Sequence, residues 1–84
     1  MRVVLDVLTE RPHRLGEPVL VVESDEWTIT VTCNGQGTYW VNQVDVLNEE
    51  NWRSQTVRSV IEARDVARTW AQQGIREVAG GMHA

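Results

Sequence analysis

The sequence contains no lysine and no phenylalanine, and its single cysteine, Cys33, cannot form a disulfide within the chain. The two histidines, His13 and His83, lie at no spacing typical of metal ligands, so we expect no metal and no cofactor. No apolar run is long enough to span a bilayer, and the apolar stretch 3–8 is interrupted by Asp6, which argues against a signal peptide. These absences predict a cytoplasmic protein without a membrane segment.

Motifs of common catalytic sites are also missing. The sequence holds neither GxSxG nor HExxH. The segment 34–37 is too short for a phosphate-binding loop, and it joins two predicted strands rather than a strand and a helix. We expect one histidine in a mobile loop and the other in the tail, which argues against general acid–base catalysis. The sequence therefore predicts a protein that is not an enzyme.

Eighty-four residues suffice for one domain. We expect it to cover residues 1–79, with a flexible tail over residues 80–84. Residues 1–50 carry three arginines and nine acids, a net charge of −6, whereas residues 51–84 carry five arginines and three acids, a net charge of +2. The total of −4 argues against non-specific nucleic-acid binding. The use of arginine alone as the basic residue, together with four tryptophans, favours a GC-rich source such as an actinobacterium or its phage.

The clearest structural signal is the strict alternation of apolar and polar residues from Trp27 to Cys33. Asn34-Gly-Gln-Gly follows as a turn signal, and a second strand returns after it. Two further segments, rich in valine and leucine, precede this hairpin and are separated by a loop over residues 9–18. The predicted strands cover residues 2–8, 19–23, 27–33 and 38–46.

A four-residue turn gives a register for this hairpin in which Val31 lies opposite Trp40 and Cys33 lies opposite Thr38. One face then holds most of the large apolar residues: Trp27, Ile29, Val31, Cys33, Trp40 and Val44. The other face, called the threonine face here, holds Thr28, Thr30, Thr32, Tyr39, Val41 and Gln43. A shift of one residue would move Trp40 and Val44 to the threonine face and divide the apolar set. We therefore expect a loop with an even number of residues.

Residues 48–73 are predicted to form one long amphipathic helix that begins at Asn48, with Ser54 as the alternative cap. Its apolar stripe consists of Val57, Val60, Ile61, Ala63, Ala67, Trp70 and Ala71. Gly74 is expected to end the helix, with Ile75 packed against the last turn. Residues 75–78 are compatible with a short final strand.

The predicted fold is therefore α+β, an antiparallel four-stranded sheet with one helix on one face, in the order ββββα or ββββαβ. Strands 2–8 and 19–23 have apolar residues on both faces, yet one helix covers only one face of a sheet. The surplus must meet the long loop, a closed barrel or another subunit.

Two groups of residues are candidates for binding a partner. The threonine face is the first, since Tyr39 and Val41 give it contact area, although an ordinary solvent-exposed face shows the same pattern. Arg64 and Arg68 are the second, because two arginines one helical turn apart suit a carboxylate or phosphate. Two simpler readings apply to Arg64: its stem covers the sheet with the guanidinium in water, or it forms an ion pair with Asp6 or Asp45 in the same molecule.

The sequence elements Trp27-x-Ile29-x-Val31 and Glu62-Ala63-Arg64-x-x-Ala67-x-x-Trp70 resemble, in their order, two small groups of proteins. These are antitoxins with a three-stranded sheet and a helix, and the arm-binding domains of phage integrases. The second resemblance implies DNA binding by a sheet with arginine or lysine on its exposed strands. Residues 27–46 contain neither.

These observations favour a non-enzymatic protein-interaction module, homodimeric through the second sheet face or an edge strand. One alternative is a small acidic inhibitor of phage type, which would bind a basic host or defence protein by charge mimicry. Another is a nucleic-acid-binding accessory domain that uses Arg58, Arg64, Arg68 and Arg76.

Overall fold

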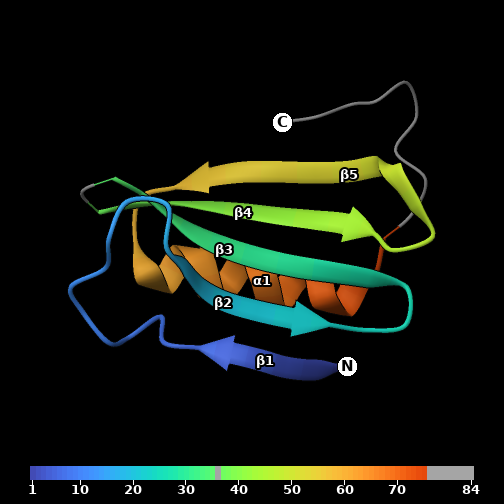
Figure 1. Ribbon diagram of the computed structural model, residues 1–84, viewed down its shortest axis with the longest axis horizontal. Coiled ribbons are helices and arrows are strands. Elements are labelled where there is room, and N and C mark those ends of the chain that lie inside the picture. The colour runs from blue at the N-terminus through green and yellow to red at the C-terminus, as the bar shows by residue number, and fades with distance from the viewer. Residues whose placement is uncertain (36, 76–84) are drawn as a thin grey trace.

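A computed structural model describes residues 1–35 and 37–75 and shows five strands followed by one helix (Figure 1). The strands are β1 (Arg2–Asp6), β2 (Pro18–Glu23), β3 (Trp27–Gly35), β4 (Thr38–Asp45) and β5 (Asn48–Val57), and the helix is α1 (Val60–Gln73). Every strand pairs antiparallel with its neighbour in sequence, in the order β1-β2-β3-β4-β5. The predicted α+β class and antiparallel sheet are confirmed, with a fifth strand before the helix.

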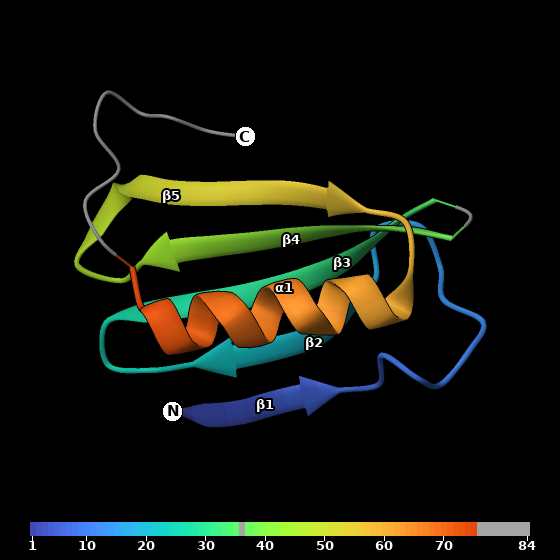
Figure 2. The same ribbon diagram turned by 180° about the vertical axis from the view of Figure 1, so that it is seen from behind.

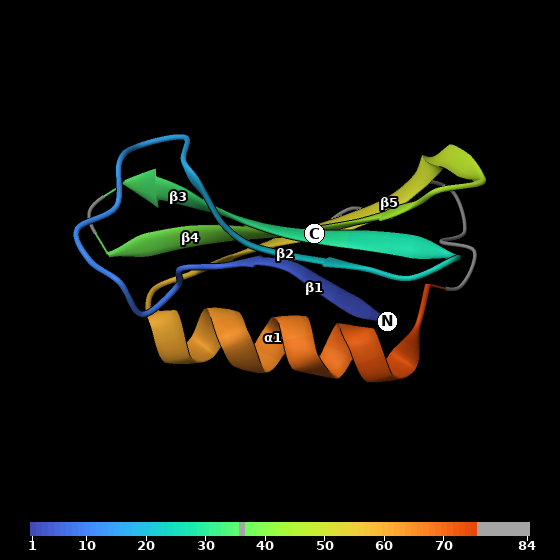
Figure 3. The same ribbon diagram turned by 60° about the horizontal axis from the view of Figure 1, so that its bottom comes forward.

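The helix packs on a single face of the sheet, where it contacts β3 and β4. Figures 2 and 3 show it on that face. Alternate residues of β3 point toward it, so that Trp27, Ile29, Val31 and Cys33 are all buried. The helix contributes Val60, Ala63, Ala67 and Trp70 to the same core. The core therefore lies between one sheet face and one stripe of α1.

The prediction of a helix over residues 48–57 is wrong, because this segment forms β5 beside β4. Asn48 and Asp45 use their side chains for turns instead. Oδ1 of Asn48 accepts the Glu50 N–H at 3.2 Å, and Oδ1 of Asp45 accepts the Leu47 N–H at 2.8 Å. A polar residue before two acids is typical of a helix start and of a turn, and sheet pairing decided between them here.

The helix begins eleven residues later than the prediction has it, at Ser59, whose Oγ accepts the Glu62 N–H at 3.0 Å. The predicted end at Gly74 is confirmed. This glycine has a positive φ of 71°, and its N–H donates to the Trp70 carbonyl at 2.9 Å. Ile75 packs against the core, as expected. Ile61, in contrast, is 76% exposed and is not part of the apolar stripe.

The predicted register of the β3–β4 hairpin is also wrong. Cys33 pairs with Tyr39 and Val31 pairs with Val41, one residue away from the expected pairing. The cause is an irregularity between Cys33 and Gly35, after which Gly35 pairs with Thr38. The extra residue of this bulge shifts the pairing by one. Each side chain of β4 therefore lies on the sheet face opposite to the predicted one.

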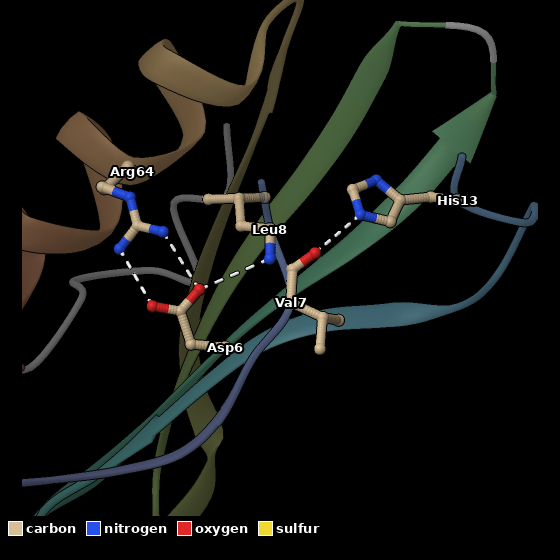
Figure 4. Close-up of polar contacts among 5 residues, drawn as sticks. All are labelled: Asp6, Val7, Leu8, His13 and Arg64. Carbon is tan, nitrogen blue, oxygen red and sulfur yellow. Dashed lines mark hydrogen bonds and ion pairs between the residues drawn. The ribbon is translucent and has the colours of Figure 1, made fainter. Parts of the chain in front are cut away.

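The end of β1 is tied to elements on both sides (Figure 4). The Asp6 carboxylate accepts two bonds from the Arg64 guanidinium, at 3.0 and 3.2 Å, and Oδ1 of Asp6 also accepts the Leu8 N–H at 3.4 Å. The Val7 carbonyl accepts a bond from Nε2 of His13 at 2.8 Å. The long β1–β2 loop is thereby anchored at its start, and its Leu8 is fully buried.

Two predictions concern residues beyond this description. The short final strand expected over residues 75–78 lies outside it except for Ile75, and the tail expected over residues 80–84 lies outside it entirely.

Candidate functional site

The sheet face opposite α1 is the main candidate site, and no element of the described residues lies across it (Figure 3). Cross-strand partners share a face, so the strand register identifies its members. We call it the open face. It consists of Leu5, Val21, Thr28, Thr30, Thr32, Trp40, Asn42, Val44, Trp52, Ser54 and Thr56.

The open face is built from rows of side chains that run across the strands. In one row Thr32 pairs with Trp40, and Trp40 pairs with Thr56. In a second row Thr28 pairs with Val44, and Val44 pairs with Trp52. A third row lies between these two and contains Leu5, Val21, Thr30, Asn42 and Ser54. Trp40 is 41% exposed, which makes it the most exposed aromatic side chain among the large apolar residues of the described chain. Threonine and β-branched neighbours surround it with a mixed apolar and hydroxyl surface.

Charge is nearly absent from these rows. The row of Thr28 and Val44 begins with Glu23, whose neighbour on β1 is Arg2. Nη2 of Arg2 donates to Oε1 of Glu23 at 2.7 Å, so the two charges neutralise each other at the edge of the sheet. The centre of the open face is uncharged.

The structure divides the predicted threonine face. Thr28, Thr30 and Thr32 lie on the open face and are half-buried. Tyr39, Val41 and Gln43 lie on the opposite face, where they are 3%, 0% and 0% exposed. The bulge after Cys33 accounts for the division. The placement of these three residues on an accessible face is therefore wrong.

The sequence predicts other positions for several residues of the open face. It places Trp40 and Val44 in the core, and it places Trp52, Ser54 and Thr56 in the helix. The signal that identifies the first two is the alternative register, in which they join the threonines. Trp52 could have been identified by the β-strand propensity of the segment that contains Thr56 and Val57.

The two arginines of the second candidate group lie on the helix side of the sheet. The Arg64 guanidinium is held by Asp6, as one of the two simpler readings has it. The Arg68 side chain is exposed, and none of the described residues offers it a hydrogen-bonding or ion-pair partner. Arg76, the last of the four arginines in the nucleic-acid alternative, lies outside the described residues.

Both ring nitrogens of His13 have hydrogen-bond partners, although the sequence predicts this residue in a mobile loop. Its Nε2 lies 2.8 Å from the Val7 carbonyl oxygen, and its Nδ1 lies 2.8 Å from the Tyr39 hydroxyl oxygen. A carbonyl only accepts, so Nε2 carries a proton, and in the neutral ring Nδ1 accepts from the Tyr39 O–H. The two rings meet edge to face with centroids 5.6 Å apart. The histidine thereby fastens the β1–β2 loop to β4.

Within residues 1–35 and 37–75, no three His, Cys, Asp or Glu side chains are grouped so that they could hold a metal ion. Cys33 is buried, and its Sγ lies 3.5 Å from the Gly35 carbonyl oxygen. The helix in the described part of the chain is too short and too polar to cross a membrane.

In comparisons with known proteins, no family model, no curated protein and no solved structure matches this chain.

Proposed function

We propose that the protein is a non-enzymatic protein-interaction module that binds through its open face, and that the partner is a second copy of the same chain. The observation that carries this proposal is the position of Trp40. Trp40 is 41% exposed on a sheet face that no described element covers. Tryptophan is enriched in the centres of protein interfaces because it combines a large apolar area with a polar N–H.

The burial of this residue gives a meaningful driving force. A tryptophan buries at most about 250 Å² of surface. The exposed part of Trp40 would then bury roughly 100 Å², worth about 2.5 kcal/mol in each copy. Val44 and Trp52 lie on the same face, two rows away, and add apolar area. The threonines can present methyl groups to a partner while their hydroxyls exchange hydrogen bonds.

The charge distribution supports a second copy as the partner. The protein has a net charge of −4, so most of its surface repels another copy. On the rows of the open face, however, the charged residues Arg2 and Glu23 form an ion pair with each other. Two open faces can therefore meet in an isologous contact without placing unpaired like charges together.

Light scattering over a range of concentrations, with Trp40→Glu as the variant, tests this proposal. We expect the wild-type chain to form a dimer, and Trp40→Glu to be a monomer with an unchanged circular dichroism spectrum. Ile61→Glu is the matched control, because Ile61 is an exposed apolar residue on the outer side of α1. This control should remain a dimer. A wild-type chain that is monomeric at every concentration contradicts the homodimer.

The acidic-inhibitor alternative is favoured by a different observation. The β2–β3 and β4–β5 turns lie side by side, since the Val46 N–H donates to the Glu26 carbonyl at 3.0 Å. This end of the sheet gathers the acids Asp25, Glu26, Asp45, Glu49 and Glu50. The alternative predicts a monomer whose binding to a basic protein weakens steeply with salt. If the alternative holds, the double change Asp25→Asn and Glu26→Gln should weaken binding to the basic protein. If the first proposal holds, the same double change should leave the dimer intact.

A further inference from the structure

A groove of about 330 Å³ lies between the free edge of the sheet and the helix, on the opposite side of the sheet from the open face. Its floor is formed by Leu20 and Val22 of β2 and by Ala67 of α1, all of which are buried members of the core. Val3 of β1 forms its outer wall and is 57% exposed. Figures 2 and 3 show β1 running beside α1 along this side of the molecule.

The charge at the rim is positive. Asp6 lines one end of the groove, but its carboxylate is neutralised by the two bonds from Arg64 (Figure 4). Arg68 lies one turn further along α1, and no acid among the described residues pairs with it. An apolar floor beside one unpaired guanidinium, in a chain of net charge −4, suits a ligand that carries an apolar group and a negative charge.

The strand that lines the groove, β1, is an edge strand of the sheet. β1 is the first strand in the sheet order and pairs only with β2 among the described strands. An edge strand presents unpaired N–H and C=O groups along its outer side, and these groups pair readily with another extended chain. In strand addition, the main chain supplies affinity and alternate side chains enter pockets beside the strand.

We propose that the groove binds an extended peptide segment of a partner protein, which pairs with β1 as an added strand. A large apolar side chain of the peptide fills the space above Leu20, Val22 and Ala67. An acidic side chain of the same peptide binds the Arg68 guanidinium. A fatty acid would satisfy the floor and Arg68, but it would leave the outer backbone groups of β1 without partners. The site is separate from the open face, so it goes beyond the function proposed above.

Val3 and Val4 provide a matched pair of variants. They are neighbours on β1 with similar exposure, 57% and 52%, but only Val3 lines the groove. Val3→Asp places a charge against the apolar and acidic groups of the peptide, whereas Val4→Asp adds the same charge outside the groove. Arg68→Glu and Arg58→Glu form a second pair, because Arg58 is an exposed arginine that precedes the helix and does not line the groove.

Random heptapeptides displayed on phage are selected on the full chain, and the recovered peptides are synthesised and titrated. We expect them to share an apolar residue with an acid within a few positions. Their affinity should fall about tenfold or more for Val3→Asp and Arg68→Glu, and stay unchanged for Val4→Asp and Arg58→Glu. Unchanged melting temperatures establish that the variants are folded. A selection without binders, or binders that are insensitive to both groove variants, overturns the proposal.

Amide hydrogen exchange distinguishes strand addition from simple filling of the groove. A bound peptide should slow the exchange of amides in residues 2–5, because their outward N–H groups gain partners. Decanoate is the second probe, since it offers an apolar chain and a carboxylate without a peptide backbone. If decanoate binds in the groove and the selected peptides leave the exchange of β1 unchanged, the peptide proposal is wrong and the site takes amphipathic small molecules.

Discussion

The guanidinium of Arg53 lies over the ring of Trp70, with its Cζ atom 4.4 Å from the ring centroid. Nε of Arg53 donates to Oε1 of Gln43 at 2.7 Å, and its two terminal nitrogens donate to Oε1 of Gln73 and to the Gly74 carbonyl, each at 3.2 Å. One side chain of β5 thus binds β4 and the last turn of α1 at once. Its positive charge also lies at the negative end of the helix dipole.

We predict that Arg53→Ala lowers the free energy of unfolding by about 3 kcal/mol. Three hydrogen bonds from a charged donor and one cation–π contact are lost, and the buried Gln43 loses a partner. Arg53→Lys should cost less, about 1–2 kcal/mol, because it keeps the charge but not the planar fork. Burial lowers the pKa of Arg53, yet an arginine stays charged throughout the useful pH range. Urea unfolding followed by circular dichroism measures both variants.

The matched control for Arg53 is Arg58→Ala, an exposed arginine whose loss should change the free energy of unfolding by less than about 0.5 kcal/mol. If Arg53→Ala behaves like this control, the contacts of Arg53 with the helix end do not contribute to stability.

The ion pair of Asp6 and Arg64 predicts a pH dependence. The hydrogen bonds from Arg64 lower the pKa of the Asp6 carboxyl, against the opposing effect of burial. The stabilisation is therefore fully present above the ordinary aspartate pKa of about 3.9 and is lost as the pH falls through the lowered pKa. Both side chains are about one third exposed, so we expect the ion pair to contribute less than about 1 kcal/mol to the free energy of unfolding.

Asp6→Asn removes this stabilisation without a change of shape. The free energy of unfolding of the wild type minus that of Asp6→Asn should be constant near neutral pH and shrink in acid. Asp25→Asn, a change of an exposed acid in the β2–β3 turn, should show no such trend. A difference for Asp6→Asn that does not vary with pH would contradict the assignment.

The contact of His13 with Tyr39 predicts the tautomer of the His13 ring and a contribution to the free energy of unfolding. Nitrogen chemical shifts of the His13 ring should show the proton on Nε2 in the neutral form, because this atom faces the Val7 carbonyl. Tyr39→Phe removes the hydroxyl that faces Nδ1 and should lower the free energy of unfolding by about 1 kcal/mol. The loop at residues 9–18 should then become more sensitive to proteases. A neutral ring with its proton on Nδ1 would show that the hydrogen bonds are arranged differently.

Much of the local structure was predictable. The alternation from Trp27 to Cys33 marked a strand with one buried face, and the structure confirms that strand. The end of the helix was predictable for a similar reason. Only glycine adopts the backbone conformation found at Gly74 without strain, so its position after an apolar stripe marks the helix end.

The composition of the candidate site was not predictable to the same degree. Trp40 moved from the expected core to the open face because a bulge after Cys33 shifted the register by one residue. The predicted register keeps the largest apolar set together, but Tyr39, Val41 and Gln43 are the residues of β4 that are buried. Gln43 can be buried because the Trp70 carbonyl and the Arg53 guanidinium bind its side-chain amide. These partners come from α1 and β5, and no local pattern reveals them.

The sequence by itself determined the α+β class, four of the five strands and the end of the helix, because backbone geometry and residue spacing act within a few neighbouring positions. The tertiary structure decided the state of residues 48–57, which are compatible with a helix start and with a strand until β4 offers them hydrogen bonds. It also decided which sheet face stays open. A period of two residues defines two faces equally well, and only the packing of α1 distinguishes the inner face from the outer one.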